Sequence, residues 1–295
     1  RDNRWVDISR LRLLLELSRL GSMQDVAVEL RTSTSTVSQG IAALARDVGT
    51  PLIEPDGRRV RLTPAGHRLA EHAVTIIAAV DAARGDLDPS TEPVGAVRVA
   101  GFATAIRRSL VPVIDDLATR HPGLQVRVHE YEPAEALDLL ARDDVDLALV
   151  YDYTLAPASW RSEHDVRPLW EDEWGLGVRV TERRTALADF SGDDWIVNSR
   201  HTADEEVLRT LASMAGFTPN VVHRIDALEL VDDLVVAGLG VALLPLARHT
   251  HPGVRVLPLD PSPLLRGHAV TRLGRDSWPP LRAVLDRLRP AAAAG

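Results

Sequence analysis

The sequence predicts an α/β multidomain protein, with a small helical domain at the N-terminus and a larger domain of alternating strands and helices after it. Apolar residues recur at helical spacing through the first part of the chain. From residue 94 onward, short apolar runs alternate with helical patterns. A polar segment with two prolines, residues 86–93, separates these patterns. The 295 residues therefore divide into one small and one large domain.

The N-terminal domain begins with an amphipathic helix over residues 7–20, which Gly21 ends and Ser22 follows as the next cap. Two short helices come next, and their apolar positions are Met23, Val26, Ala27 and Leu30, then Val37, Ile41 and Leu44. Ser33 is placed to cap the second of them. This arrangement predicts a helix-turn-helix, a DNA-binding motif whose second helix reads the major groove.

Polar side chains cluster at the start of that second helix, where a recognition helix meets base edges and phosphates. The candidates for DNA contact are Ser33, Thr34, Ser35, Thr36, Ser38 and Gln39. Serine and threonine are also favoured as helix caps, so a capped helix without DNA is the alternative. The helix-turn-helix context favours DNA.

A basic hairpin follows within residues 51–62, with the turn signal Asp56-Gly57 between two short strands. Three arginines lie on it: Arg58, Arg59 and Arg61. A basic hairpin beside a recognition helix is typical of a winged helix, whose wing contacts backbone phosphate. A merely solvated hairpin is the alternative. We expect residues 1–63 to form a DNA-binding domain.

A longer helix over residues 64–86 starts with Thr63 as N-cap and Pro64 in its first turn. Its apolar residues follow a four-three spacing typical of a self-associating seam: Leu69, Ala73, Ile76, Val80, Ala83 and Leu87. The seam is shorter than the roughly three to four heptads of a coiled coil, so a helix packed on its own domain is the alternative. We expect a dimerisation helix over residues 64–88 and a hinge over 89–93.

The C-terminal domain, residues 94–295, contains two series of alternating strands and helices. The first is expected at 96–101, 107–120, 124–131, 134–141 and 145–151, and the second at 174–180, 195–197, 204–215, 220–225, 228–237 and 241–244. Such alternation implies a mostly parallel sheet. We expect one lobe over residues 94–158 plus 268–290, a second over 159–267, and a ligand cleft between them.

Polar side chains follow strand ends in both lobes, where open α/β sheets bind ligands. Thr104 and nearby backbone N–H groups are placed to receive an anionic or polar ligand at a helix N-terminus. The other candidates are Tyr131, Asp152 and Tyr153 in the first lobe and Asn198, Ser199 and Arg200 in the second. A helix cap, a packing tyrosine and a surface arginine are the structural alternatives.

The charge of the chain is unevenly distributed. The first 66 residues hold ten Arg against eight acidic residues, or +2, and the rest holds 24 Arg against 34, or −10, which sum to −8. The acidity therefore belongs to the C-terminal body and does not exclude DNA. Lysine is absent. Arginine favours bidentate contacts to phosphate or guanine, although genomic base composition is the alternative explanation.

Several function classes lack support in the sequence. No apolar run reaches the roughly 18 residues that cross a bilayer, and residues 1–10 show no signal-peptide pattern, so we expect a cytoplasmic protein without membrane contact. Cysteine is absent, which removes thiolate chemistry. His249, His251 and His268 show no zinc spacing. Catalytic and nucleotide motifs are also missing, so neither an enzyme nor a cofactor or metal is expected.

The motifs of both halves resemble those of the LysR-type transcriptional regulators of bacteria. The similar segments are residues 11–23, 27–30, 36–38, 41–44, 49–53 and 62–66 in the N-terminal half, and 110–112, 121–122, 146–150 and 238–245 in the C-terminal half. The chain departs from the pattern at Ser35, Gly40 and Pro55, where the family usually carries a proline, a longer polar residue and a wing arginine. Gly40 is expected to remove a base contact.

The resemblance implies a winged helix-turn-helix, a linker helix that pairs two subunits, and a two-lobed effector domain like type 2 periplasmic binding proteins. It also implies tetramers that bind promoter inverted repeats in double-stranded DNA, with RNA polymerase as an additional candidate partner. A small-molecule effector between the lobes would change the DNA geometry. Two other functions are less consistent with the sequence. A pure solute-binding protein would have no need of the DNA-binding N-terminal domain, and an architectural DNA binder would have no need of the ligand cleft.

Overall fold

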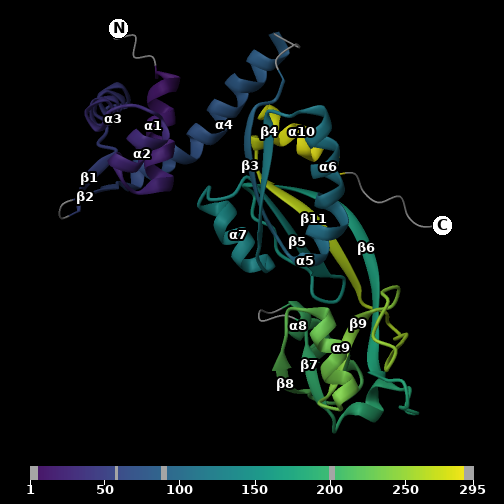
Figure 1. Cartoon of the computed structure of the whole chain (residues 1–295). Helices are drawn as coiled ribbons and strands as arrows, with labels where there is room; N and C mark the ends of the chain where they lie inside the picture. Colours follow the sequence, from purple (N-terminus) through teal and green to yellow (C-terminus); the bar gives the residue numbers. More distant parts are fainter. Residues whose placement is uncertain (1–5, 57–58, 88–91, 199–202, 289–295) are drawn as a thin grey trace.

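The computed structural model describes residues 6–56, 59–87, 92–198 and 203–288, and the side chains of residues 59 and 85–87 lie outside this description. Figure 1 shows an N-terminal helical domain, a long helix leading away from it, and a C-terminal domain of two lobes joined by long strands. In these ranges no helix is both long and apolar enough to cross a membrane.

Three helices form the N-terminal domain, each started by a side-chain cap. They are α1 (Ile8–Leu20), α2 (Met23–Glu29) and α3 (Thr34–Val48). Oxygens of Asp7, Ser22 and Ser33 accept hydrogen bonds from backbone N–H groups of the first turns. Gly21 and Gly49 end α1 and α3 in the left-handed conformation. The apolar positions predicted for these helices pack into one core.

The wing and the long helix are tied together by one capping residue. The elements are β1 (Ile53–Asp56), β2 (Arg59–Leu62) and α4 (Pro64–Leu87). Thr63 Oγ1 accepts from the Gly66 backbone N–H at 3.0 Å and donates to the Pro51 carbonyl at 2.8 Å. Gly66 approaches the wing so closely that a Cβ there would lie 2.1 Å from the Leu52 carbonyl oxygen.

The first half of α4 packs against its own N-terminal domain. Ala70, Ala73, Val74 and Ile77 are buried in the same core as α1 and α3. Among the residues of the predicted seam, Ala73 packs in the core of its own subunit, whereas Ile76 is 39% exposed. The alternative of a helix packed on its own domain describes this half of α4.

The middle of α4 contacts the C-terminal domain. Thr75 Oγ1 donates to the Leu273 carbonyl at 3.3 Å, next to the short helix η3 (Arg275–Ser277). Arg275 in turn binds Asp146 at 3.0 Å, and Asp146 also pairs with Arg98 at 3.0 Å. The linker helix is thus connected to a buried ion-pair cluster of the first lobe.

The C-terminal domain is built on strands in the order β4-β3-β5-β11-β6-β9-β7-β8, with β10 paired to β6. Their bounds are β3 (Gly95–Gly101), β4 (Leu124–Glu130), β5 (Leu147–Tyr153), β6 (His164–Arg179), β7 (Asp194–Val197), β8 (Asn220–Arg224), β9 (Val241–Pro245), β10 (Val254–Leu257) and β11 (Leu264–Arg272). The β3-β4, β3-β5, β7-β8 and β7-β9 pairs are parallel, and the pairs made by β6 and β11 are antiparallel. The sheet is therefore mixed, and the expectation of a mostly parallel sheet is wrong, because two antiparallel strands run through its middle.

Helices pack on the strands of each lobe. The first lobe has α5 (Ala103–Ala105), η1 (Ile106–Leu110), α6 (Val111–Arg120), α7 (Pro133–Ala141) and α10 (Pro279–Leu285). The second has α8 (Ala203–Met214) and α9 (Leu228–Ala237), together with the short helix η2 (Leu187–Phe190). Large buried side chains such as Leu117, Phe190 and Trp195 fill the space between these helices and the strands.

One strand, β6, belongs to both lobes (Figure 1). Glu173 pairs with Leu264 on β11, and the next residue, Trp174, pairs with Pro245 on β9. The first lobe therefore comprises residues 95–173 and 264–288, and the second comprises 174–263. The change of lobe lies later than 158–159, because residues 164–173 of β6 still pair with β11 in the first sheet. The return lies earlier than 267–268, because this pairing already begins at Leu264.

The close approach of Gly66 to the wing predicts a steric cost. We expect Gly66→Ala to destabilise the protein by about 1–3 kcal/mol, because the Leu52 carbonyl is backbone and cannot rotate away. The midpoint of urea unfolding, followed by circular dichroism, measures this. Gly192→Ala is the control, since a Cβ at Gly192 meets no atom within 4 Å. Equal midpoints for the two variants would contradict the tight contact.

Candidate ligand cleft and nucleic-acid interface

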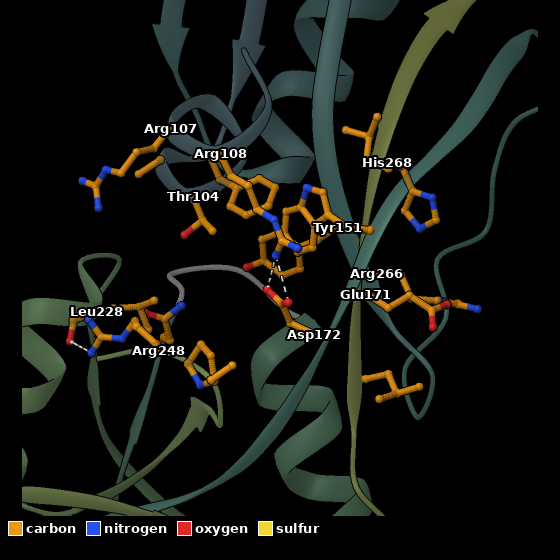
Figure 2. A pocket seen from close by; sticks show the side chains of 18 of the residues that line it. Thr104, Arg107, Arg108, Tyr151, Glu171, Asp172, Leu228, Arg248, Arg266 and His268 are labelled. Carbon is orange, nitrogen blue, oxygen red and sulfur yellow. Dashed lines mark hydrogen bonds and ion pairs between the residues drawn. The ribbon is translucent and has the colours of Figure 1, made fainter. Parts of the chain in front are cut away.

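A cavity of about 1460 Å³ lies between the two lobes. The first lobe contributes Phe102, Thr104, Arg107, Arg108, Tyr151 and Trp170, and the second contributes Asn198, Asp226, Leu228, Glu229, Pro245 and Arg248. Figure 2 shows Thr104, Arg108 and Tyr151 facing Leu228 and Arg248 across this space. Clefts of this kind, concave and shared by two lobes, are where proteins hold small molecules.

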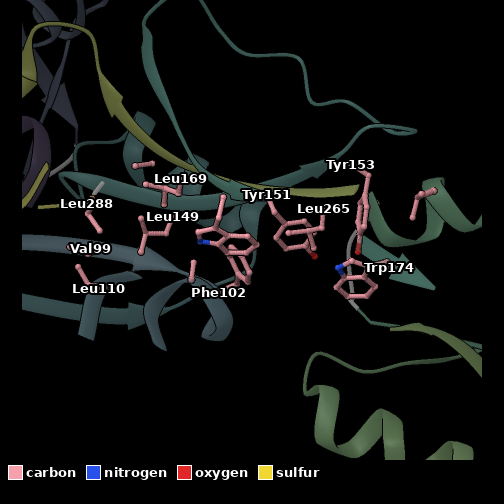
Figure 3. Close-up of a cluster of buried hydrophobic side chains, with 14 of the residues drawn as sticks. Val99, Phe102, Leu110, Leu149, Tyr151, Tyr153, Leu169, Trp174, Leu265 and Leu288 are labelled. Carbon is pink, nitrogen blue, oxygen red and sulfur yellow. The ribbon is translucent and has the colours of Figure 1, made fainter. Parts of the chain in front are cut away.

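Aromatic rings form one wall of the cavity. The Phe102 ring lies 4.7 Å from the Tyr151 ring and 6.2 Å from the Trp170 ring, measured between centroids. Figure 3 shows Phe102, Tyr151, Tyr153 and Trp174 following one another along the buried cluster toward the second lobe. The Trp170 Nε1–H donates to Ser109 Oγ at 3.0 Å, which fixes the plane of the indole. The wall is therefore apolar and held in place.

An arginine and an aspartate occupy the middle of the cavity. Arg108 Nη1 lies 2.8 Å from each carboxylate oxygen of Asp172, as the dashed lines in Figure 2 show. The Arg108 guanidinium also lies over the Trp170 ring, 4.6 Å from its centroid. Both interactions hold Arg108 against the first lobe.

The other arginines of the interlobe space are also paired. Arg107 from η1 reaches Glu229 of α9 at 3.6 Å, which makes an ion pair between the lobes. Arg248 lies 2.6 Å from the buried Asp232. In the ranges that the structure covers, no group of three or more His, Asp or Glu side chains is placed to hold a metal ion.

A buried carboxylate joins the lobes beneath the cavity. Asp204 of α8 is 4% exposed and accepts a hydrogen bond from the Tyr151 hydroxyl at 2.6 Å and from the Tyr153 hydroxyl at 2.7 Å. Both tyrosines stand on β5 of the first lobe, and Tyr151 also lines the cavity. A ligand that touches Tyr151 therefore touches one partner of the contact between the lobes.

Burial decides the protonation of this carboxylate. Desolvation raises the pKa of Asp204 to about 6, and the hydrogen bonds from Tyr151 and Tyr153, which favour the charged form, offset it only in part. The nearby Asp226 adds to the rise. Burial also raises the pKa of Tyr153 well above its ordinary value, so this tyrosine remains a hydrogen-bond donor.

At the other end of the molecule, the start of α3 presents polar side chains to solvent. Thr34, Ser35, Thr36, Ser38 and Gln39 are exposed, while Val37 between them is buried. Ser33 Oγ accepts from the Thr36 backbone N–H at 3.1 Å and lies 2.8 Å from both the Ser35 and Thr36 hydroxyls. The arrangement combines a capped helix start with an exposed polar turn.

The wing belongs to the same small domain, and its residues Leu52 and Leu62 share the core of α3. Arg61 is 66% exposed at its side chain and pairs with Glu54 across the hairpin at 2.8 Å. Arg59 stands opposite Asp56 in the ladder, and Arg58 lies outside the described residues. Gly40 faces α1, because a Cβ there would lie 2.3 Å from Leu13 Cδ1. The expectation that Gly40 removes a base contact is therefore wrong.

Comparisons with known proteins agree with both halves of this description. The description "Bacterial regulatory helix-turn-helix protein, lysR family" matches residues 8–67, and "LysR substrate binding domain" matches residues 90–293. The chain belongs to the LysR family. It is a DNA-binding transcriptional regulator with a substrate-binding effector domain.

Curated LysR-type relatives cover most of the chain. A probable hydrogen peroxide-inducible genes activator of Mycobacterium avium is 30% identical over 248 residues, which is 81% of this chain and 77% of that protein. The transcriptional dual regulator GltC of Bacillus subtilis strain 168 is 25% identical over 248 residues, or 81% of each chain. The relatives are regulators of transcription.

Solved structures share the fold over nearly all of the chain. Full-length OxyR from Pseudomonas aeruginosa, in a substituted form, aligns with a TM-score of 0.71 at 21% identity over 96% of this chain and 95% of that one. Full-length CbnR in complex with its target DNA aligns with a TM-score of 0.51 at 20% identity over 96% and 98%. At these identities the likeness describes the fold.

Two of the residues predicted for the effector site of this LysR-type regulator line the cavity, and three do not. Thr104 and Asn198 lie on its walls. Asp152 and Tyr153 are buried inside the sheet, because β5 continues to Tyr153 instead of ending at Tyr151. Asp152 is held by Arg266 at 2.6 Å and His268 at 3.0 Å.

Tyr131 is 37% exposed and stands outside the cavity lining, with its ring 6.5 Å from that of His129. Ser199 and Arg200 lie outside the described residues.

The sequence did not single out the groups that dominate the cleft, namely Arg108, Tyr151, Trp170, Asp172 and Arg248. The alternation of β6 carries a usable signal, because Trp170, Asp172 and Trp174 fall at every second position and therefore share one face. Recognising a strand before Trp174 would have placed these three side chains together.

The buried Asp204 predicts a pH dependence of stability. The pKa of its carboxyl is about 6 in the folded protein and 3.8 in its ordinary state, so the folded protein binds this proton more tightly. Stability from this group is present below about pH 4 and is lost as the pH rises through 6. Asparagine does not titrate, so Asp204→Asn should not show this loss. We therefore expect the unfolding free energy of Asp204→Asn, relative to that of the parent protein, to rise by up to roughly 3 kcal/mol between pH 4 and 7.

Urea unfolding of the full chain over this pH range measures the difference. Glu205→Gln on the same helix is the matched control. Hydrogen bonds from Arg209 lower the pKa of Glu205, so its contribution has the opposite sign and grows as the pH rises. If the difference in unfolding free energy between the parent protein and Asp204→Asn stayed constant with pH, the raised pKa of Asp204 would be contradicted.

Proposed function

We propose that this LysR-type regulator binds promoter inverted repeats through α3 and the wing, and that a small molecule between the lobes controls its effect on transcription. This proposal rests mainly on Tyr151, which lines the cavity and also donates a hydrogen bond to Asp204 across the boundary between the lobes. A bound ligand at this wall acts on the contact that sets the lobe geometry.

The linker helix gives this change a route to the DNA-binding domain. The Thr75–Leu273 hydrogen bond and the Arg275–Asp146–Arg98 cluster fix the first lobe against α4. The second lobe has no such attachment among the described hydrogen bonds and ion pairs. Ligand binding therefore displaces the second lobe relative to α4 and the domain that α4 carries.

Self-association supplies the symmetry that an inverted repeat requires, because two-fold DNA sites are read by two-fold proteins. The exposed side of α4, which includes Ile76, is the proposed dimer surface, and a tetramer is proposed as a dimer of dimers. RNA polymerase is a further proposed partner. A protein that acts on promoters works where the bacterial chromosome lies, which places this one in the cytoplasm.

A role in peroxide sensing, suggested by the name of the Mycobacterium avium relative, fits this chain poorly. A common reversible route to peroxide sensing is the oxidation of a cysteine thiolate, and this sequence has no cysteine for it. Catalysis is likewise not part of the proposal, because the relatives are transcriptional regulators.

Selection from genomic DNA tests the proposal. Purified protein is mixed with fragmented DNA of its source organism, and the retained fragments are sequenced. We expect a few promoter fragments that share an interrupted inverted repeat. Uniform retention of all fragments would instead indicate an architectural DNA binder and overturn the proposal.

The wing provides a more local prediction. We expect Arg61→Ala to weaken binding to all DNA sequences alike and to reduce the slope of log affinity against log salt by about 0.9 per lost phosphate contact. Arg142→Ala, an exposed arginine beyond α7, is the control and should leave the slope unchanged. A loss confined to one base pair of the operator would contradict phosphate contact.

A further inference from the structure

The walls of the cleft carry an excess of negative charge. Among the described residues that line the cavity, seven are Asp or Glu and four are Arg, which leaves three more negative than positive charges when histidine is neutral. A cleft with walls of low dielectric constant and one dominant sign of charge concentrates ligands of the opposite sign. The cavity is therefore electrostatically suited to a cation.

Each of the four guanidiniums already has a carboxylate partner. Arg107 lies 3.6 Å from Glu229, Arg108 lies 2.8 Å from Asp172, Arg248 lies 2.6 Å from Asp232 and Arg266 lies 2.6 Å from Asp152. An anionic ligand would have to compete with a protein carboxylate at every one of these positions. At Asp172 the described ion pairs give Arg108 as the cationic partner, so a cationic ligand that binds there takes the place of this arginine.

Arg108 shows how a cation is held here. Its guanidinium lies 4.6 Å from the centroid of the Trp170 ring and within 2.8 Å of both Asp172 oxygens. An aromatic face with an adjacent carboxylate is a favourable site for an ammonium or amidinium group. Trp170 is 7% exposed and anchored through Ser109, whereas the Arg108 side chain is 40% exposed. Arg108 is the part of this arrangement that can leave.

A second observation lies in the recess beside this pair, lined by Phe102, Tyr151, Trp174 and Asn198. The Asn198 Oδ1 atom is buried and accepts no hydrogen bond from any residue that the structure describes. The Trp174 Nε1–H is also buried and has no acceptor within the described ranges, and Trp174 as a whole is 3% exposed. A buried polar atom without a hydrogen-bond partner costs free energy. Polar groups of a ligand or a water molecule in the recess would remove this cost. An N–H of a cationic ligand satisfies Asn198, and a water or an acceptor on the ligand satisfies Trp174.

We infer that the cleft takes a small organic cation, an amine or amidinium on a flat apolar body, which displaces Arg108 from Trp170 and Asp172. The apolar body packs against the aromatic wall of Phe102 and Tyr151. This inference rests on the proposed function, because it names the chemical class of the effector for the same cleft.

Three probes that share one ring separate the charge classes: benzamidine is a cation, benzamide is neutral and benzoate is an anion. Each is titrated into the full chain by isothermal calorimetry in about 150 mM salt, where long-range attraction is screened. We expect benzamidine to bind one molecule per chain and at least about tenfold more tightly than the other two, a difference of about 1.4 kcal/mol.

Two substitutions locate the site, and they change the affinity in opposite directions. Asp172→Asn should weaken benzamidine binding about tenfold, because it removes the carboxylate and keeps the shape. Arg108→Ala should tighten it, because the Trp170 face becomes vacant, and a misfolded variant cannot give this result. Asp138→Asn on α7, an exposed carboxylate outside the cavity lining, is the matched control and should change nothing.

Binding of benzoate or benzamide as tightly as benzamidine, or binding of none of the three at millimolar concentration, overturns the inference. An equal effect of Asp172→Asn and Asp138→Asn overturns it as well, since that result reports net charge alone. The selection of promoter fragments is scored separately. Retained promoters together with a preference for benzoate would overturn the cationic effector and leave the proposed regulator intact.

Discussion

The backbone ladder of β6 is the constraint on which the C-terminal domain depends. This strand pairs with β11 up to Glu173 and with β9 from Trp174 onward, so one continuous strand is shared by two sheets. Buried backbone N–H and C=O groups must remain paired, and the lobes can therefore bend or twist at this point but cannot separate there. Trp170 and Asp172, which form the centre of the cleft, stand on β6 just before the change of partner.

Local signals in the sequence were sufficient for the N-terminal half of the fold. The predicted caps Ser22, Ser33 and Thr63 act within a few residues of their own position, so their side-chain chemistry alone predicts where those helices start. The exposed polar turn of α3 follows from the same reasoning. Helix periodicity similarly predicted α6, α7, α8 and α9 to within a few residues, whereas α10 was not predicted.

The central strands and most of the cleft depend on contacts that no local pattern contains. The first half of β6 carries alternating charges that are matched by residues distant in sequence, such as Arg108 opposite Asp172 and Arg167 opposite Asp276. In β11, Gly267 reads as a strand breaker, yet the ring of Trp170 occupies the space where a Cβ would lie, at 2.7 Å. The composition also did not indicate a structural role for the many arginines. Bidentate pairs such as Arg266–Asp152 join neighbouring strands within the acidic C-terminal domain.

The divided first lobe determines which lobe can be completed first while the chain is being synthesised. Residues 174–263 form the second lobe without interruption, and its strands β7, β8 and β9 pair among themselves or with the end of β6. The first lobe needs β11, which pairs with both β5 and β6 and leaves the ribosome last among the strands. Domains generally fold as their segments emerge, so the second lobe is complete while β3, β4 and β5 still lack their central partner. The ligand cleft is therefore among the last features of the molecule to form during translation.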